Sequence, residues 1–258
     1  MPILPDSTAV VTGAAGGIGR ALAARLVAEG VRVVVNDIDE VRLAETADQI
    51  GAHPVAGDAA SVEGVARLVG AAKDHLGQID TWYGNAGIDR GHGLDCPEED
   101  WQASHEVNVM AHVRAARLLV PEWVERGSGR YVVTASAAGL LMMVGTPTYS
   151  VTKHAAVAFA EWLSATYRHH GIVVQAICPQ GVQTGMLERA GQMAGLLSRD
   201  GALTPEQVAD SAWEATADDR FLVLPHPEVA DYYAARATQT DKWLGGMNRL
   251  WQHVEGQV

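Results

Sequence analysis

A β-strand, a glycine-rich turn and a helix follow one another near the start of the chain, and this succession constrains the fold most. Ala9–Thr12 is a β-branched run that favours a buried strand. The loop Thr12–Gly19 reads TGAAGGIG, and a helical pattern then continues to about Glu29. Glycines let a backbone approach a phosphate closely, and a helix N-terminus offers it free N–H groups. The segment therefore indicates a phosphate-binding loop, the alternative being a tight turn without function.

Strand-like and helix-like segments alternate along the rest of the chain. Short loops between them predict right-handed crossovers, and therefore one α/β domain over residues 1–258 with a parallel sheet. The further predicted strands are Val31–Val35, Pro54–Ala56, Ile79–Tyr83, Gly129–Ser136, Ile172–Ile177 and Phe221–Leu224. The longer predicted helices are Ser61–His75, Glu98–Arg126 and Pro147–His170.

Charge and composition narrow the class of protein. The formal net charge of −12 disfavours nucleic acid and anionic membranes as partners. Cys96 and Cys178 lack metal-binding or redox spacing, which predicts reduced thiols and no metal site. Residues 1–6 do not resemble a signal peptide, and no apolar run is long enough to span a bilayer. These features together predict a cytoplasmic protein.

Tyr149 and Lys153 stand four residues apart in a helical run, so their side chains share one face. An ammonium beside a phenol favours the phenolate, and we expect Lys153 to lower the pKa of Tyr149. Such a pair can exchange protons near neutral pH. The same spacing is also common on helix surfaces that have no catalytic role.

Asp37 ends the second predicted strand, about twenty residues beyond the glycine loop, where a carboxylate can accept hydrogen bonds from an adenosine ribose. It would repel a 2′-phosphate. Ile38 follows it and Gly16 precedes Gly17, so neither position carries a basic residue, which favours NAD over NADP. Asp37 or Asp39 can equally be a helix N-cap.

Two further polar residues stand out. Asn108 lies in an otherwise apolar helical stretch and is either a satisfied core amide or a site group. Ser136 lies at the carboxyl end of the fifth predicted strand, on the rim where open α/β sheets bind ligands.

Taken together, these segments resemble the short-chain dehydrogenase/reductase family. Thr12–Gly19 matches its TGxxxGxG loop, Asn85–Gly87 its NAG motif, and Tyr149 with Lys153 its YxxxK motif. Ser136 matches the family's serine. Asn108 matches its catalytic asparagine, and Asp58 matches the aspartate that contacts adenine. The match covers nearly the whole chain in the right order.

The resemblance implies a single-domain, Rossmann-type, doubly wound parallel sheet of about seven strands with helices on both faces. It implies that Tyr149 transfers the proton, that Lys153 lowers its pKa and binds the nicotinamide ribose, that Ser136 binds the substrate oxygen, and that Asn108 holds a relay water. The implied NAD contacts are Gly13, Gly16, Gly17, Ile18, Gly19, Asp37, Ile38, Asp58, Ala59, Asn85, Ala86, Gly87, Tyr149, Lys153, Pro179, Val182 and Thr184.

Three positions depart from the family pattern. Gln180 replaces a glycine in Pro179–Thr184, which leaves the backbone there in question. Gly84 stands where a second asparagine is usual, and bulky Trp82 and Tyr83 precede it. The sequence offers no functional account of Gly84, Trp82 or Tyr83.

Two apolar segments are expected to border the substrate. One is Leu140–Val144, and the other is a lid at about residues 184–203 that contains Met186, Leu187, Met193, Leu196 and Leu197. Arg189 and Arg199 are isolated there. The expected substrate contacts are Ser136, Leu140, Met142, Tyr149, Gln180 and Met186. The substrate is then a hydrophobic secondary alcohol or its ketone, and polyols, sugars and acyl carriers with charged arms are poorer substrates. Alternatively, these residues only pack the lid or an interface.

Three functions fit such a chain. The first is an NAD-dependent alcohol dehydrogenase or ketone reductase; the second is a non-catalytic dinucleotide sensor on the same fold. The joint presence of Ser136, Tyr149, Lys153 and Asn108 favours the enzyme. The third is a dehalogenase on this scaffold, but that chemistry typically uses arginine at the position of Lys153 and a degraded glycine loop.

The helix from Pro147 is apolar nearly all round and predicts a homotetramer or homodimer. Trp243, Leu250 and Trp251 near the C-terminus could supply a second contact between subunits.

Overall fold

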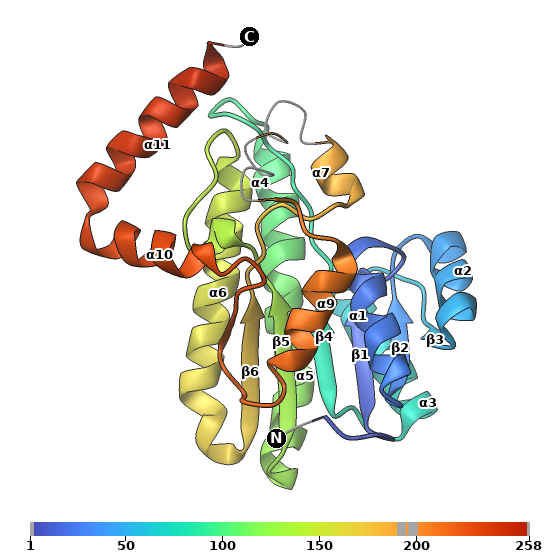
Figure 1. Ribbon diagram of the computed structural model, residues 1–258. Helices are drawn as coiled ribbons and strands as arrows, with labels where there is room; N and C mark the ends of the chain where they lie inside the picture. Colours follow the sequence, from blue (N-terminus) through green and yellow to red (C-terminus); the bar gives the residue numbers. More distant parts are fainter. Residues whose placement is uncertain (1–2, 190–194, 196–200, 257–258) are drawn as a thin grey trace.

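Seven parallel strands form one sheet in the computed structural model, which describes residues 3–189, 195 and 201–256 (Figure 1). The strand order is β3-β2-β1-β4-β5-β6-β7. The chain runs outward from β1 to β3 and then crosses to β4, so the topology reverses between β1 and β4. Ligands of open α/β sheets bind at such a reversal, outside the carboxyl ends of the strands. The strands are β1 Thr8–Thr12, β2 Arg32–Asn36, β3 His53–Pro54, β4 Thr81–Gly84, β5 Gly129–Thr134, β6 Ile172–Ile177 and β7 Leu222–Val223.

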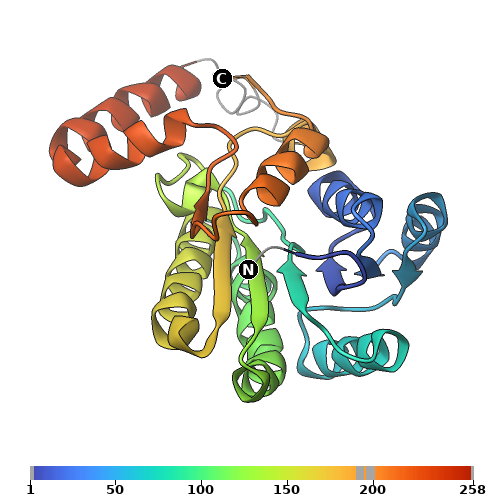
Figure 2. The same ribbon diagram turned by 60° about the horizontal axis from the view of Figure 1, so that its bottom comes forward.

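Helices cover both faces of the sheet, as Figure 2 shows. On one face lie α1 Gly17–Ala28, α2 Glu40–Ile50 and α9 Pro205–Glu214; on the other lie α3 Val62–Leu76, α5 Ala111–Arg126 and α6 Pro147–Tyr167. Neighbouring strand residues enter opposite cores: Val10 faces α3 and α5, whereas Val11 faces α1. Because side chains alternate along a strand, β1, β2, β4, β5 and β6 each contribute to both cores. The predicted doubly wound parallel sheet is therefore confirmed.

Most predicted elements lie close to their expected bounds, and β6 has the bounds that were predicted. The single long α-helix predicted over Glu98–Arg126 is wrong. It is divided into α4 Glu98–His105, a π-helical turn over Glu106–Met110, and α5. π-helical turns inside α-helices are frequent at functional sites. This one contains Asn108, which the turn directs toward the loop after β4.

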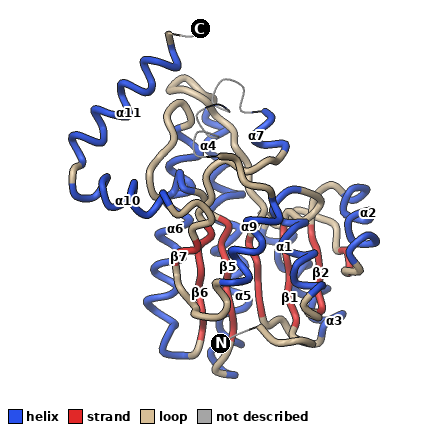
Figure 3. The backbone as a smooth tube through the Cα atoms, viewed as in Figure 1, coloured by secondary structure: helices blue, strands red, loops and turns tan. Residues whose placement is uncertain are grey.

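The chain ends in a two-helix arm, α10 Glu228–Thr238 and α11 Thr240–Glu255, which extends from the β7 edge and rises beyond the carboxyl ends of the strands (Figures 1 and 3). Val229 of α10 is fully buried, and the Arg236 guanidinium donates to the Leu140 carbonyl. Arg236 also lies 3.0 Å from His154 Nε2. α11 contains no fully buried residue. No helix among the described residues is long and apolar enough to cross a membrane.

The structure explains Gly84, for which the sequence offered no account. A Cβ at position 84 would lie 2.5 Å from Nδ1 of His112, a buried side chain of α5. Burial lowers the pKa of His112 to about 3, so this imidazole is neutral at physiological pH. Trp82 and Tyr83, both 2 % exposed, fill the cores on opposite faces of the sheet. These departures from the family pattern are therefore packing features.

We expect Gly84→Ala to lower the free energy of unfolding by about 2 kcal/mol, because the new methyl group overpacks against His112. In a His112→Ala background the same change should cost less than about 1 kcal/mol, since the opposing ring is gone. Urea denaturation of the four proteins measures both values. Gly70→Ala in α3 is the matched control, because no atom lies within 4 Å of the added Cβ. Equal costs in both backgrounds would contradict this account.

Candidate active site

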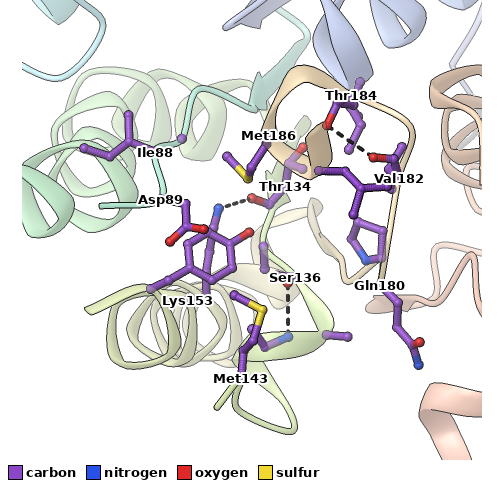
Figure 4. Close-up of a pocket in the computed structure, with 18 of the residues that line it drawn as sticks. Ile88, Asp89, Thr134, Ser136, Met143, Lys153, Gln180, Val182, Thr184 and Met186 are labelled. Carbon is purple, nitrogen blue, oxygen red and sulfur yellow. Dashed lines mark hydrogen bonds between the residues drawn. The ribbon is translucent and has the colours of Figure 1, made fainter. Parts of the chain in front are cut away.

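Tyr149 and Lys153 lie in the first turns of α6, and both side chains are buried, 9 % and 3 % exposed. Lys153 Nζ donates to the Thr134 carbonyl at 2.9 Å and lies 5.6 Å from the centre of the Tyr149 ring. Ser136 follows β5, and its Oγ accepts from Ala138 N–H at 3.1 Å, which fixes the side chain (Figure 4). The helix and the strand end thus bring together three of the four predicted catalytic side chains, Ser136, Tyr149 and Lys153.

The expected lowering of the Tyr149 pKa is wrong for this state of the protein. Burial dominates and raises the pKa of Tyr149 to about 12, although a hydrogen bond from Ser136 acts in the opposite direction. Burial also lowers the pKa of Lys153 to about 8. Removal from water disfavours the charged form of each group. Tyr149 is therefore a phenol at neutral pH and holds a proton ready for transfer.

Asn108 is fully buried and does not border the cleft that contains the other predicted residues. Its Oδ1 accepts from Ile88 N–H at 2.9 Å, and its Nδ2 donates to the Ile88 carbonyl at 2.9 Å and to Thr152 Oγ1 at 3.0 Å. The amide thus ties the loop after β4 to α6 at Thr152, next to Lys153. The relay water that the resemblance implies stays a prediction.

The glycine loop packs against the turn after β4. Thr12 Oγ1 accepts from the N–H groups of Asn85 and Ala86, both at 3.0 Å, and Asn85 Nδ2 donates back to the Thr12 carbonyl at 3.0 Å. Gly13 has a positive φ of 65°, and a Cβ there would lie 2.8 Å from Ala86 Cα. Only glycine fits, and the bare backbone at the start of α1 forms a cradle for a pyrophosphate.

Gly19 was expected to contact NAD, but it does not border the cleft. A Cβ on this residue would overlap the Gly13 carbonyl. Gly19 therefore lets α1 pack closely on the loop and is not expected to touch a cofactor.

Asp37 borders the opposite end of the cleft from Tyr149. Its Oδ2 accepts from Ala15 N–H at 3.0 Å and its Oδ1 from Asp39 N–H at 3.1 Å, while Asp39 caps α2. The helix-cap alternative therefore applies to Asp39, and the Asp37 carboxylate stands at the glycine loop as a ribose ligand requires.

Sequence reasoning missed Arg42, which also borders this end of the cleft. Its Nη2 lies 2.9 Å from the position that a Cβ on Gly16 would occupy. Ile38 and Gly16 are not basic, as the sequence shows, but a basic side chain from α2 lies beside Gly16. The first turn of α2 directs Arg42 back toward the loop, and neither neighbouring position in the sequence reveals this contact.

All other residues predicted to contact NAD border one continuous cleft, and so do Ser136, Met142, Gln180 and Met186. Leu140 was expected to contact the substrate, but it is 1 % exposed, packs in the core, and does not border the cleft. Leu141 and Met143 take its place there. Gln180 has no positive φ, so its backbone does not require glycine. Its amide points away from Ser136 in Figure 4.

The substrate end of the cleft is mostly apolar. Its walls come from residues 141–144, from α7 Gly185–Arg189, and from α11, whose contribution the sequence did not predict. The apolar side chains are Leu141, Met142, Met143, Val144, Met186, Leu187, Trp243, Met247 and Leu250. Of the predicted lid, residues 190–194 and 196–200, with Met193, Leu196, Leu197 and Arg199, lie outside the described residues.

Asp89 is a second residue that sequence reasoning missed. It borders the cleft beside Lys153 (Figure 4), and its Oδ1 is buried without a hydrogen-bond partner in the described part of the chain. Burial raises the pKa of this carboxyl, and the nearby charges of His92, Arg189 and Lys153 lower it. Asp89 directly follows Ile88, whose backbone Asn108 holds, and this contact is visible only in the structure.

Comparisons with known proteins agree with this geometry. The family model described as short chain dehydrogenase matches residues 7–195. The chain is 35% identical to 1-deoxy-11-beta-hydroxypentalenate dehydrogenase of Streptomyces exfoliatus, over 97% of this chain and 90% of that protein. It is 30% identical to human epidermal retinol dehydrogenase 2, over 84% and 73% of the two chains.

Among solved structures, a short-chain dehydrogenase/reductase from Burkholderia phymatum in complex with NAD superposes with a TM-score of 0.85 at 29% identity. The alignment covers 93% of this chain and 96% of that one. The family model spans most of the chain, and the sheet order, glycine cradle and Ser–Tyr–Lys arrangement fit it. The chain therefore belongs to the short-chain dehydrogenase family of oxidoreductases.

Proposed function

We propose that the protein is an NAD-dependent dehydrogenase that interconverts a hydrophobic secondary alcohol and its ketone. One observation carries the proposal: Ser136, Tyr149 and Lys153 meet in a single cleft between the glycine cradle and a methionine-rich apolar wall. A dinucleotide held at the cradle and extended along the cleft reaches this trio. An apolar substrate enters from the other side.

The roles of the residues follow from their positions. The start of α1 binds the pyrophosphate, Asp37 binds the adenosine ribose, and Lys153 binds the nicotinamide ribose. NAD or NADH bound there would supply the hydride chemistry that interconverts the alcohol and the ketone. Ser136 donates a hydrogen bond to the substrate oxygen, which stabilises the charge that develops there. Tyr149 donates its proton to that oxygen in reduction and accepts one in oxidation.

Names of relatives agree with oxidation or reduction at a hydroxyl-bearing carbon. The two relatives above are named for a hydroxypentalenate and for retinol. A non-catalytic sensor is not favoured, because binding alone needs no buried Ser–Tyr–Lys arrangement. Lys153 and the complete glycine loop likewise disfavour a dehalogenase.

A substrate series tests this function. NADH absorbance is followed with secondary alkyl alcohols, aryl-alkyl alcohols, polyols and small hydroxy acids, and kcat/KM is compared across the series. We expect the alkyl and aryl-alkyl alcohols to be turned over best, because Met142, Met143 and Met186 adapt to irregular apolar groups. A clear preference for sugars or for small hydroxy acids would contradict the proposal.

We also infer a homotetramer or homodimer that uses α5 and α6. Leu118 of α5 is 41 % exposed, and Val151 and Trp162 of α6 are each 55 % exposed. Covering these apolar side chains with a second copy removes them from water. Light scattering at micromolar concentration should give a multiple of the 27.4 kDa chain mass. A monomeric mass would rule this assembly out.

The free thiols of Cys96 and Cys178 support a cytoplasmic location.

A further inference from the structure

One face of α11 borders the substrate end of the cleft. The residues of α11 that line it follow the three- and four-residue spacing of a helix face: Lys242, Trp243, Gly246, Met247, Arg249, Leu250 and His253. Trp251 packs against the loop of residues 141–145: a Cβ on Gly145 would lie 2.9 Å from its ring. α11 therefore forms a wall of the substrate site, and we call its seven cleft-lining residues the inner face.

The glycines of this helix have no packing explanation. Gly245 and Gly246 lie in the helix interior, where each glycine costs about 1 kcal/mol relative to alanine. Added Cβ atoms there would meet only the Arg249 guanidinium, at 3.7 and 3.9 Å. That contact is with the end of a flexible side chain. Gly246 thus leaves the backbone of α11 open to the cleft beside a cation, and an open backbone allows a ligand to approach closely.

The charges on α11 are divided between its faces. Lys242 and Arg249 lie on the inner face, and neither makes an ion pair within the described residues. The acidic Asp241 and Glu255 of the same helix do not border the cleft. In a chain with a net charge of −12, cations gathered on the wall of a cleft concentrate anions locally.

Other charged groups at this end do not cancel the two cations. Arg90 and Arg189 also border the cleft. The one described carboxylate there, Asp89, lies deeper, beside Lys153. The pyrophosphate cradle is at β1, whereas α11 follows the β7 edge, so the inner face is separate from the cofactor site.

We propose that the inner face of α11 binds a carboxylate carried at the far end of an otherwise apolar substrate. This inference rests on the dehydrogenase function proposed above and specifies its substrate class. Trp243, Met247 and Leu250 contact the apolar body, while Lys242 and Arg249 contact the carboxylate. The reacting hydroxyl lies at Ser136 and Tyr149, so a long hydroxy acid spans the site. A small hydroxy acid lacks the apolar body and reaches only one end.

The first experiment compares long-chain hydroxy acids, with the hydroxyl on the penultimate carbon, with their methyl esters. We expect kcat/KM to favour the acid over the ester by about tenfold at low salt, and the advantage to shrink as salt screens the charges. In Lys242→Gln/Arg249→Gln the acid should lose this advantage through KM, while the ester is unaffected. Arg168→Gln, an exposed position after the end of α6 and away from the cleft, is the matched control and should behave as the unmodified protein.

The second experiment measures binding without turnover. Calorimetry of the protein saturated with NADH should show decanoate binding more tightly than decanol, with the difference lost in the double variant. Equal binding of the two ligands, or equal kcat/KM for acid and ester, would overturn the carboxylate site while leaving the dehydrogenase function intact. Tight decanoate binding without turnover of any secondary alcohol would instead contradict the proposed function and leave the carboxylate site supported.

Discussion

Replacing Tyr149 with phenylalanine is expected to lower kcat by about a thousandfold or more, within the range for loss of a positioned acid–base group. The Tyr149 phenol borders the cleft, forms a hydrogen bond with Ser136, and has Lys153 Nζ 5.6 Å from the centre of its ring. The buried ring itself remains, so the affinity for NADH should change less than about threefold. Steady-state kinetics and a fluorescence titration with NADH measure the two effects separately.

Tyr167→Phe is the matched control. This tyrosine lies at the end of the same helix, does not border the cleft, and has no part in the chemistry. Its loss should leave kcat within about twofold of the unmodified protein. Near-normal turnover by the Tyr149→Phe protein would refute the mechanism. Loss of NADH binding would show instead that the hydroxyl is needed for cofactor binding.

The second large effect concerns the choice of cofactor. We expect kcat/KM with NAD to exceed that with NADP by at least about a hundredfold, because the Asp37 carboxylate repels a 2′-phosphate at close range. Asp37→Ala should remove most of this preference. Arg42, which lies beside Gly16, is then free to attract the 2′-phosphate, so activity with NADP should rise while activity with NAD falls.

A second variant separates the two side chains. In Asp37→Ala/Arg42→Ala, the gain in kcat/KM with NADP should disappear, while the loss in kcat/KM with NAD should persist. Asp48→Ala is a suitable control, since this exposed carboxylate lies on α2, the helix that carries Arg42, but away from the cleft. Equal kcat/KM for the two cofactors in the unmodified protein would contradict the role given to Asp37.

Local patterns determined much of this molecule. The β-branched runs and the helical repeats predicted the parallel sheet, because a strand buried on both faces and a helix with one apolar face each leave a periodic signal. Tyr149 and Lys153 were identifiable because they lie about one helical turn apart on the same helix. The glycine loop was identifiable because strand, turn and helix adjoin in the chain. Each of these features depends on residues that are neighbours in sequence.

Only the tertiary structure decided which distant segments meet at the cleft. Arg42 reaches the glycine loop because α2 packs beside it, and Leu140 is withdrawn into the core while Leu141 and Met143 face the cleft. The inner face of α11 joins the substrate site because α10, held by Val229 and Arg236, directs the arm over it. Such contacts join residues far apart in the chain, and no local periodicity or spacing records them.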